Sequence, residues 1–99
     1  MVTSESITLL KQNGDWLAQI TITSDGMIAG VTDWGNFALS FRSFGNNFKE
    51  FILGLDVDYF GTKIYTQMNY MSSQKKFEKS CGILSEKILP PLQEYLRLV

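Results

Sequence analysis

The sequence predicts an α+β fold, in which a four-stranded antiparallel β-meander is followed by three or four helices packed on one face of the sheet. Three observations predict it. Large apolar residues alternate at a spacing of two through the first 42 residues, and short turn dipeptides separate these runs. From about residue 46 the spacing changes to three and four. Strands followed by helices are typical of the α+β class.

The first two strands are predicted at residues 6–11 and 16–23. Ile7 and Leu9 share one face of the first, and Asn13-Gly14 follows as a dipeptide that favours a tight hairpin. The second alternates along its whole length and is rich in β-branched residues. One face of this strand is predicted to consist of Trp16, Ala18, Ile20 and Ile22.

The third and fourth strands are predicted at residues 27–32 and 36–42. Asp25-Gly26 precedes the third as another hairpin signal, and a turn at residues 33–36 joins the two. Three large residues of the fourth strand lie on one face and are expected to cover the core beneath the helices, namely Phe37, Leu39 and Phe41. Short connections between successive strands imply antiparallel pairing.

Helices are predicted at residues 46–55, at residues 56–70 and from residue 74 onward. Asn46 is placed to cap the first helix, and Ser72 and Ser73 mark the boundary before the third. Pro90 and Pro91 are expected to end or kink the third helix, leaving a terminal piece over residues 92–98. The buried stripe of the second helix is predicted to include Val57, Phe60, Gly61, Ile64, Met68 and Met71, and that of the third Phe77, Cys81, Leu84 and Ile88.

The composition indicates one domain over residues 1–99. A hydrophobic content of 44% in 99 residues supports a single core. The chain has one cysteine, which excludes an internal disulfide and suits a reducing compartment. No leader sequence and no apolar run long enough for a membrane span is recognisable, so a soluble, cytoplasmic protein is expected.

The charge is unevenly distributed. Residues 1–60 carry three lysine or arginine side chains against seven carboxylates, whereas residues 61–99 carry six against three. The net charge of −1 argues against a dedicated nucleic-acid binder, because such proteins neutralise phosphates with excess cations. Most of these charges are interpreted as solvated faces, although the asymmetry could also orient a partner.

The residue types exclude the common catalytic and metal sites. Histidine is absent, which removes the usual base for a serine or cysteine nucleophile. One cysteine without histidine cannot form an ordinary zinc site, and the glycines match no phosphate-binding pattern. Cys81 occupies a predicted core position and is interpreted as a buried, unreactive thiol. The sequence therefore predicts a protein that is not an enzyme and has no cofactor or metal.

The candidate binding residues lie at a turn and at a helix start. Trp34 lies in the predicted turn beside Asp33, and with Arg42 it could form an anchor for a protein partner, because Trp and Arg are enriched among interface hot spots. The neighbouring phenylalanines could instead belong to a base-stacking platform, but core positions explain them better. Asp56 and Asp58 are explained better as acidic residues at a helix start than as metal ligands. Both are included among the candidate partner-binding residues.

Residues 25–65 resemble a group of small, mostly uncharacterised proteins encoded by tailed phages and prophages. The residues that carry the resemblance are Asp25-Gly26, Asp33-Trp34-Gly35, Phe37, Arg42, Phe48, Phe51 and Asp58-Tyr59-Phe60. The resemblance implies a phage setting and a bacterial host cell. In that setting, small proteins without a catalytic site often bind a host protein.

The leading hypothesis is a phage accessory protein that binds and modulates a bacterial host protein, such as an anti-CRISPR-like inhibitor of host defence. One alternative is a nucleic-acid binder with a basic patch of Lys63, Lys75, Lys76, Lys79 and Lys87. Another is a protein that sequesters a small molecule between sheet and helices. A homodimer through the edge strands, at residues 7–11 and 37–41, or through the apolar C-terminal residues is also consistent with the sequence.

Overall fold

The computed structural model describes residues 1–68 and 74–99, with the backbone alone over residues 74–79. The elements are β1 (Ser4–Leu10), β2 (Trp16–Thr23), β3 (Met27–Thr32), β4 (Gly35–Ser40), α1 (Phe48–Leu53), α2 (Val57–Gln67) and α3 (Gln74–Leu98). The strands pair antiparallel in the order β1-β2-β3-β4. This confirms the predicted α+β fold with a four-stranded meander, and the described part of the chain contains three helices.

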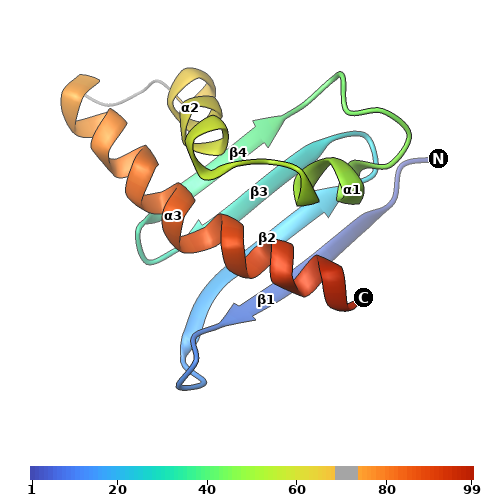
Figure 1. The fold of residues 1–99 in the computed structure, drawn as a ribbon, viewed down its shortest axis with the longest axis horizontal. Coiled ribbons are helices and arrows are strands. Elements are labelled where there is room, and N and C mark those ends of the chain that lie inside the picture. The colour runs from blue at the N-terminus through green and yellow to red at the C-terminus, as the bar shows by residue number, and fades with distance from the viewer. Residues whose placement is uncertain (69–73) are drawn as a thin grey trace.

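The core is formed by buried residues of the strands and of the three described helices. Figure 1 shows α3 crossing in front of the strands, with α2 beside its first half and α1 near the opposite end of the sheet. The strands contribute Ile7, Leu9, Ala18, Ile20, Ile22, Ile28, Phe37 and Leu39 to the core. The helices contribute Phe48, Ile52, Phe60, Ile64, Cys81, Leu84, Ile88, Leu89, Leu92 and Leu96. Burial of each large side chain stabilises the fold by about 1.5–3 kcal/mol.

The predicted placement of Trp16 on one face with Ala18, Ile20 and Ile22 is wrong. The register between β1 and β2 shifts between Leu9 and Leu10, so that Leu10 lies opposite Trp16 and Leu17 has no partner of its own. Such a bulge puts two residues of one strand against one of its neighbour and changes the alternation of faces. Leu17 is consequently buried at 7% exposure, whereas Trp16 is 39% exposed.

The aromatic corner between β4 and α1 is a packed seam. Phe37 and Phe41 are buried, as predicted. The ring centroids of Phe41 and Phe51 lie 5.3 Å apart, and those of Phe44 and Phe48 lie 4.9 Å apart. Both pairs meet edge to face, the arrangement that aromatic quadrupoles favour. These rings therefore fix the position of α1 against the end of the sheet.

Two helix starts are capped by side chains. The oxygen of Asn47, and not Asn46 as predicted, accepts a hydrogen bond from the Glu50 amide at 3.2 Å. Asp56 caps α2 by accepting a bond from the Tyr59 amide at 2.7 Å. The predicted extension of α2 to residue 70, Met71 in its stripe, and the boundary at Ser72 and Ser73 lie outside the described residues.

The two prolines do not end α3, contrary to one of the predicted outcomes. The helix continues through Pro90 and Pro91 to Leu98. Ile88, Leu89 and Leu92 flank the prolines and are fully buried, so packing on both sides compensates for the missing amide hydrogens. The predicted core position of Phe77 lies among the side chains that are not described, whereas those of Cys81, Leu84 and Ile88 are confirmed.

The side chain of Gln93 ties α3 to the end of α1. Its amide nitrogen donates to the carbonyl oxygens of Ile52 at 2.9 Å and Leu55 at 2.7 Å, and lies 3.4 Å from that of Leu53. Carbonyls in the last turn of a helix have no partner within that helix. Gln93 therefore supplies donors that α1 lacks, and it holds the part of α3 beyond the prolines in place.

Gly30 and Gly82 provide a paired test of the packing. A Cβ at Gly30 would lie 2.5 Å from the Phe37 ring and 2.9 Å from Ile20, so Gly30→Ala should lower the free energy of unfolding by about 1–3 kcal/mol. A Cβ at Gly82 meets nothing within 4 Å, so Gly82→Ala should raise it by up to about 1 kcal/mol. Urea denaturation measures both changes. Equal effects of the two substitutions would contradict the packing described for Gly30.

Candidate functional site

Trp34 is held in a fixed turn between β3 and β4. The hydroxyl oxygen of Thr32 accepts a hydrogen bond from the Trp34 amide at 3.0 Å, and the same hydroxyl donates to the Gly35 carbonyl at 2.7 Å. Gly35 has a φ of +133°, which favours glycine at this position. The indole itself is partly buried and packs against the core. The ring therefore has a defined position with one part left accessible.

Two lysines from distant parts of the chain meet this indole. The Nζ atoms of Lys11 and Lys87 each lie 5.9 Å from the Trp34 ring centroid. Lys11 follows β1, whereas Lys87 lies on α3. An ammonium group at this distance interacts favourably with the face of an aromatic ring, by about 0.5–1 kcal/mol at an exposed site. We call Lys11, Trp34 and Lys87 the tryptophan cluster; Asp33 lies beside it in the turn and is exposed.

Arg42 lies at the other end of β4 from Trp34. The six residues of β4 and Phe41 separate them, a span of roughly 25 Å at the rise of a strand. The structure therefore does not bring Trp34 and Arg42 together into the predicted anchor. The predicted strand at residues 36–42 already implied this separation, because it puts the turn with Trp34 at one end and Arg42 at the other.

Arg42 instead shares a hollow with Lys63 of α2. The hollow has a volume of about 410 Å³ and is lined by Ser40, Phe41, Arg42, Ser43, Phe51, Tyr59, Lys63 and Gln67. The ammonium group of Lys63 lies 5.8 Å from the centroid of the Phe41 ring and 5.7 Å from that of Tyr59. No carboxylate is among the lining residues. Two cations that the sequence placed in different candidate sets thus face one space, which we call the arginine hollow.

Asp56 and Asp58 have different environments. Asp56 caps α2, and that hydrogen bond explains its position. Asp58 lines a groove of about 460 Å³ between α2 and α3, together with Glu86 and the backbone of Gly61 and Gly82. Among the side chains that the structure describes, no group of three possible ligands could hold a metal ion.

The predicted basic patch is only partly described. Lys63 lies in the arginine hollow and Lys87 in the tryptophan cluster. The side chains of Lys75, Lys76 and Lys79 are outside the described part of α3. The two lysines that can be placed therefore belong to separate sites on different elements.

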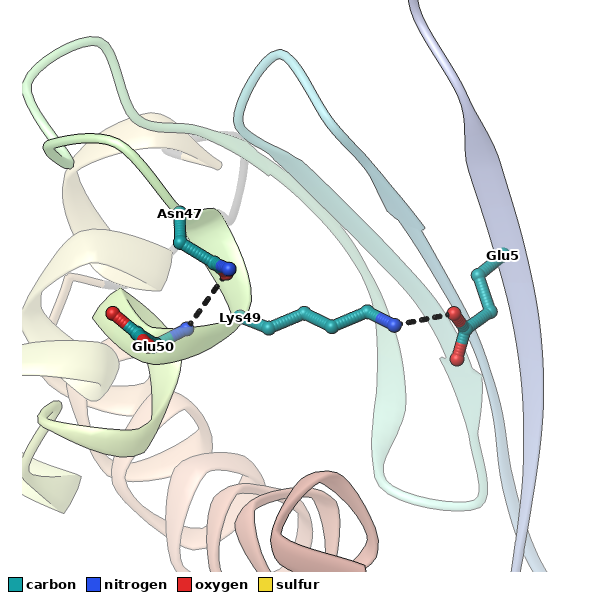
Figure 2. Close-up of polar contacts among 4 residues, drawn as sticks. All are labelled: Glu5, Asn47, Lys49 and Glu50. Carbon is teal, nitrogen blue, oxygen red and sulfur yellow. Dashed lines mark hydrogen bonds and ion pairs between the residues drawn. The ribbon is translucent and has the colours of Figure 1, made fainter. Parts of the chain in front are cut away.

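A third hollow lies between the start of α1 and the nearby end of β1. Figure 2 shows Lys49 of α1 extending to Glu5 of β1, where the Nζ to Oε1 distance is 2.7 Å. The same view shows the Asn47 cap on Glu50. Both charged side chains are partly exposed, so the ion pair contributes at most about 1 kcal/mol. The sequence predicted neither partner, because 44 residues separate them.

Cys81 has the predicted character of a buried thiol. It is 3% exposed, and burial raises its pKa to about 11 because the thiolate would lose its hydration. The thiolate, which is the reactive form, is therefore scarce near neutral pH.

Comparison with known proteins identifies one family. A family model described as a phage family matches residues 1–95. Neither the curated proteins nor the solved structures contain a match. Among the described residues, no helix is sufficiently long and apolar to cross a membrane.

The burial of Cys81 predicts a pH dependence of stability. The pKa of a cysteine in the unfolded chain is about 8.5, so between about pH 9 and 11 the unfolded state loses its proton while the folded state keeps it. The free energy of unfolding should fall in this range by up to about 2 kcal/mol more in the wild type than in Cys81→Ala. Urea denaturation at a series of pH values measures the difference. Parallel curves for the two proteins would contradict the burial effect.

Proposed function

The chain belongs to this phage family, and we propose that it is a non-enzymatic phage accessory protein that binds and modulates a bacterial host protein in the host cytoplasm. Its action is that of an anti-defence inhibitor of the anti-CRISPR kind. The phage setting supports the role. The absence of histidine from the sequence supports a mechanism by binding, without catalysis. The tryptophan cluster is the observation that carries the proposal.

The tryptophan cluster has the properties of a protein-binding anchor. Tryptophan is among the residues most enriched at interface hot spots, where a large ring enters a pocket on the partner. Thr32 and the packing of the ring already hold Trp34 in position, so little conformational entropy is lost when a partner binds. Lys11 and Lys87 give the rim a positive charge. The partner is therefore a host protein with an apolar pocket bordered by carboxylates.

The two tryptophans of the chain allow a matched test. Trp34→Ala should abolish the stoichiometric recovery of a host protein from bacterial lysate, whereas Trp16→Ala should retain it, because Trp16 lies outside the cluster. With the partner identified, Trp34→Ala should weaken binding by at least about 2 kcal/mol, or roughly thirty-fold in Kd. Isothermal titration calorimetry measures this, and a melting curve verifies that the variant folds.

Charge reversal provides a second readout that leaves the core intact. Lys11→Glu and Lys87→Glu should each weaken binding, and the loss should diminish at high salt. Lys11→Glu and Lys87→Glu should also abolish the anti-defence activity. This activity is measured as the plaquing efficiency of a sensitive phage on a host that carries the defence system. Recovery of the same partner by all these variants would overturn the proposed surface. Plaquing that does not depend on the protein would overturn the anti-defence role.

A second function is favoured by the arginine hollow, namely the binding of single-stranded nucleic acid. Arg42 and Lys63 offer two cations for phosphates, and no carboxylate among the lining residues opposes them. Tyr59 is 42% exposed, so part of its ring is accessible to a base. This composition resembles that of single-strand binding sites, where cations follow the backbone and aromatic rings stack on bases.

Fluorescence anisotropy with a labelled thymidine oligonucleotide tests this second function. Arg42→Ala and Lys63→Ala should each reduce the salt dependence by about 0.7 in the slope of log K against log salt, as expected for the loss of one phosphate contact. Tyr59→Leu should weaken binding by about 1–3 kcal/mol. Arg97→Ala removes an exposed charge from the last turn of α3 and serves as the control. No binding at low salt, or an equal loss with Arg97→Ala, would exclude the arginine hollow.

A further inference from the structure

The two edges of the sheet differ in how their backbone groups are satisfied. At β4 the side-chain amide of Gln67 forms two hydrogen bonds with Ser40, accepting from its amide and donating to its carbonyl, both at 2.9 Å. The sulfur of Met68 accepts from the Ala38 amide at 3.4 Å. Gln67 thus takes the place that a neighbouring strand would occupy. The second half of the outer edge of β4, at Ala38 and Ser40, is therefore covered by α2 and the residue after it.

The edge at β1 is open. The Ser24 amide donates to the Thr3 carbonyl, which shows that the backbone groups of Thr3 face β2. Alternate residues of an antiparallel strand face opposite sides, so those of Ser4, Ser6 and Thr8 face away from the sheet. Within the described part of the chain, no side chain bonds to these outward groups as Gln67 does at β4. They form a row of available donors and acceptors.

The sequence of β1 lacks most of the features that prevent an edge strand from pairing with another chain. Between Ser4 and Leu10 there is no proline and no lysine, and the bulge lies at the last residues of the strand. Glu5 is the one charged residue. Figure 2 shows its side chain directed toward Lys49, with which it forms an ion pair. Its charge is therefore compensated within the chain and opposes pairing only weakly.

We propose that β1 pairs antiparallel with the β1 of a second copy, with the two-fold axis at Ser6, to form a continuous eight-stranded sheet. This register sets Ser6 opposite Ser6 and Ser4 opposite Thr8, and it uses all the outward backbone groups of the regular part of β1. The facing side chains on the outer surface are then hydroxyls, which pair well across strands. Glu5 lies opposite Ile7 and not opposite its own copy. The strand is therefore complementary to itself, which identifies a second copy as the occupant.

Sedimentation equilibrium tests the pairing through charges placed on the two-fold axis. The wild type should have twice the 11.2 kDa mass of the chain. Ser6→Lys and Ser6→Glu should each be monomeric, because they put like charges directly opposite each other. An equimolar mixture of the two variants should form dimers again, because the charges are then opposite. Ser40→Lys, the same substitution on the closed edge, should remain dimeric.

The outcomes that overturn the proposal are distinct. A monomeric wild type across a concentration series would exclude the dimer. Dimers of Ser6→Lys alone would exclude the register, and failure of the mixture to associate would exclude direct pairing at Ser6. The Ser6 side chain is exposed, so both variants should keep the circular dichroism spectrum and melting temperature of the wild type. Neither substitution touches the tryptophan cluster, so this test and that of host-protein binding are independent.

Discussion

The fold depends on the need to cover one apolar face of a four-stranded meander. Antiparallel sheets can leave one face in water, but the other must be buried. Here α3, a helix of 25 residues that continues through two prolines, supplies Leu84, Ile88 and Leu92 to the buried core. The missing backbone hydrogen bonds are tolerated because Ile88, Leu89 and Leu92 are fully buried around the prolines. Gln93 fastens the same segment to α1, so a local defect is offset by tertiary contacts.

Much of the fold could be predicted because local signals agreed with tertiary structure. The strands at 16–23 and 27–32 have the expected bounds, since alternation, β-branched residues and turn glycines all indicate them. The errors occur where tertiary contacts override a local rule. A bulge in the β1–β2 pairing separates Trp16 from the face it was predicted to share with Ala18, Ile20 and Ile22, and packing allows α3 to continue past the prolines. The cap fell on Asn47, the neighbour of the predicted Asn46, because boundary positions depend on the path of the chain.

The candidate sites were less predictable than the fold. The sequence singled out Trp34 and Arg42 by residue type, but the strand between them holds them at opposite ends. Lys11, Trp34 and Lys87 meet only because the first hairpin, the third turn and α3 converge in space. The pairing of Arg42 with Lys63 likewise joins a loop to a helix. Residue type predicted which side chains could bind, whereas the assembled fold decided which of them act together.

The amide of Gln67 also limits how far the sheet can grow. A chain with two open edges could add neighbours on both sides and extend into a ribbon without end, as in cross-β fibres. With the outward groups of Ser40 and the amide of Ala38 bonded to Gln67 and Met68, strand addition at β4 is opposed. One glutamine at the end of α2 thus opposes open-ended strand addition through this edge of the sheet.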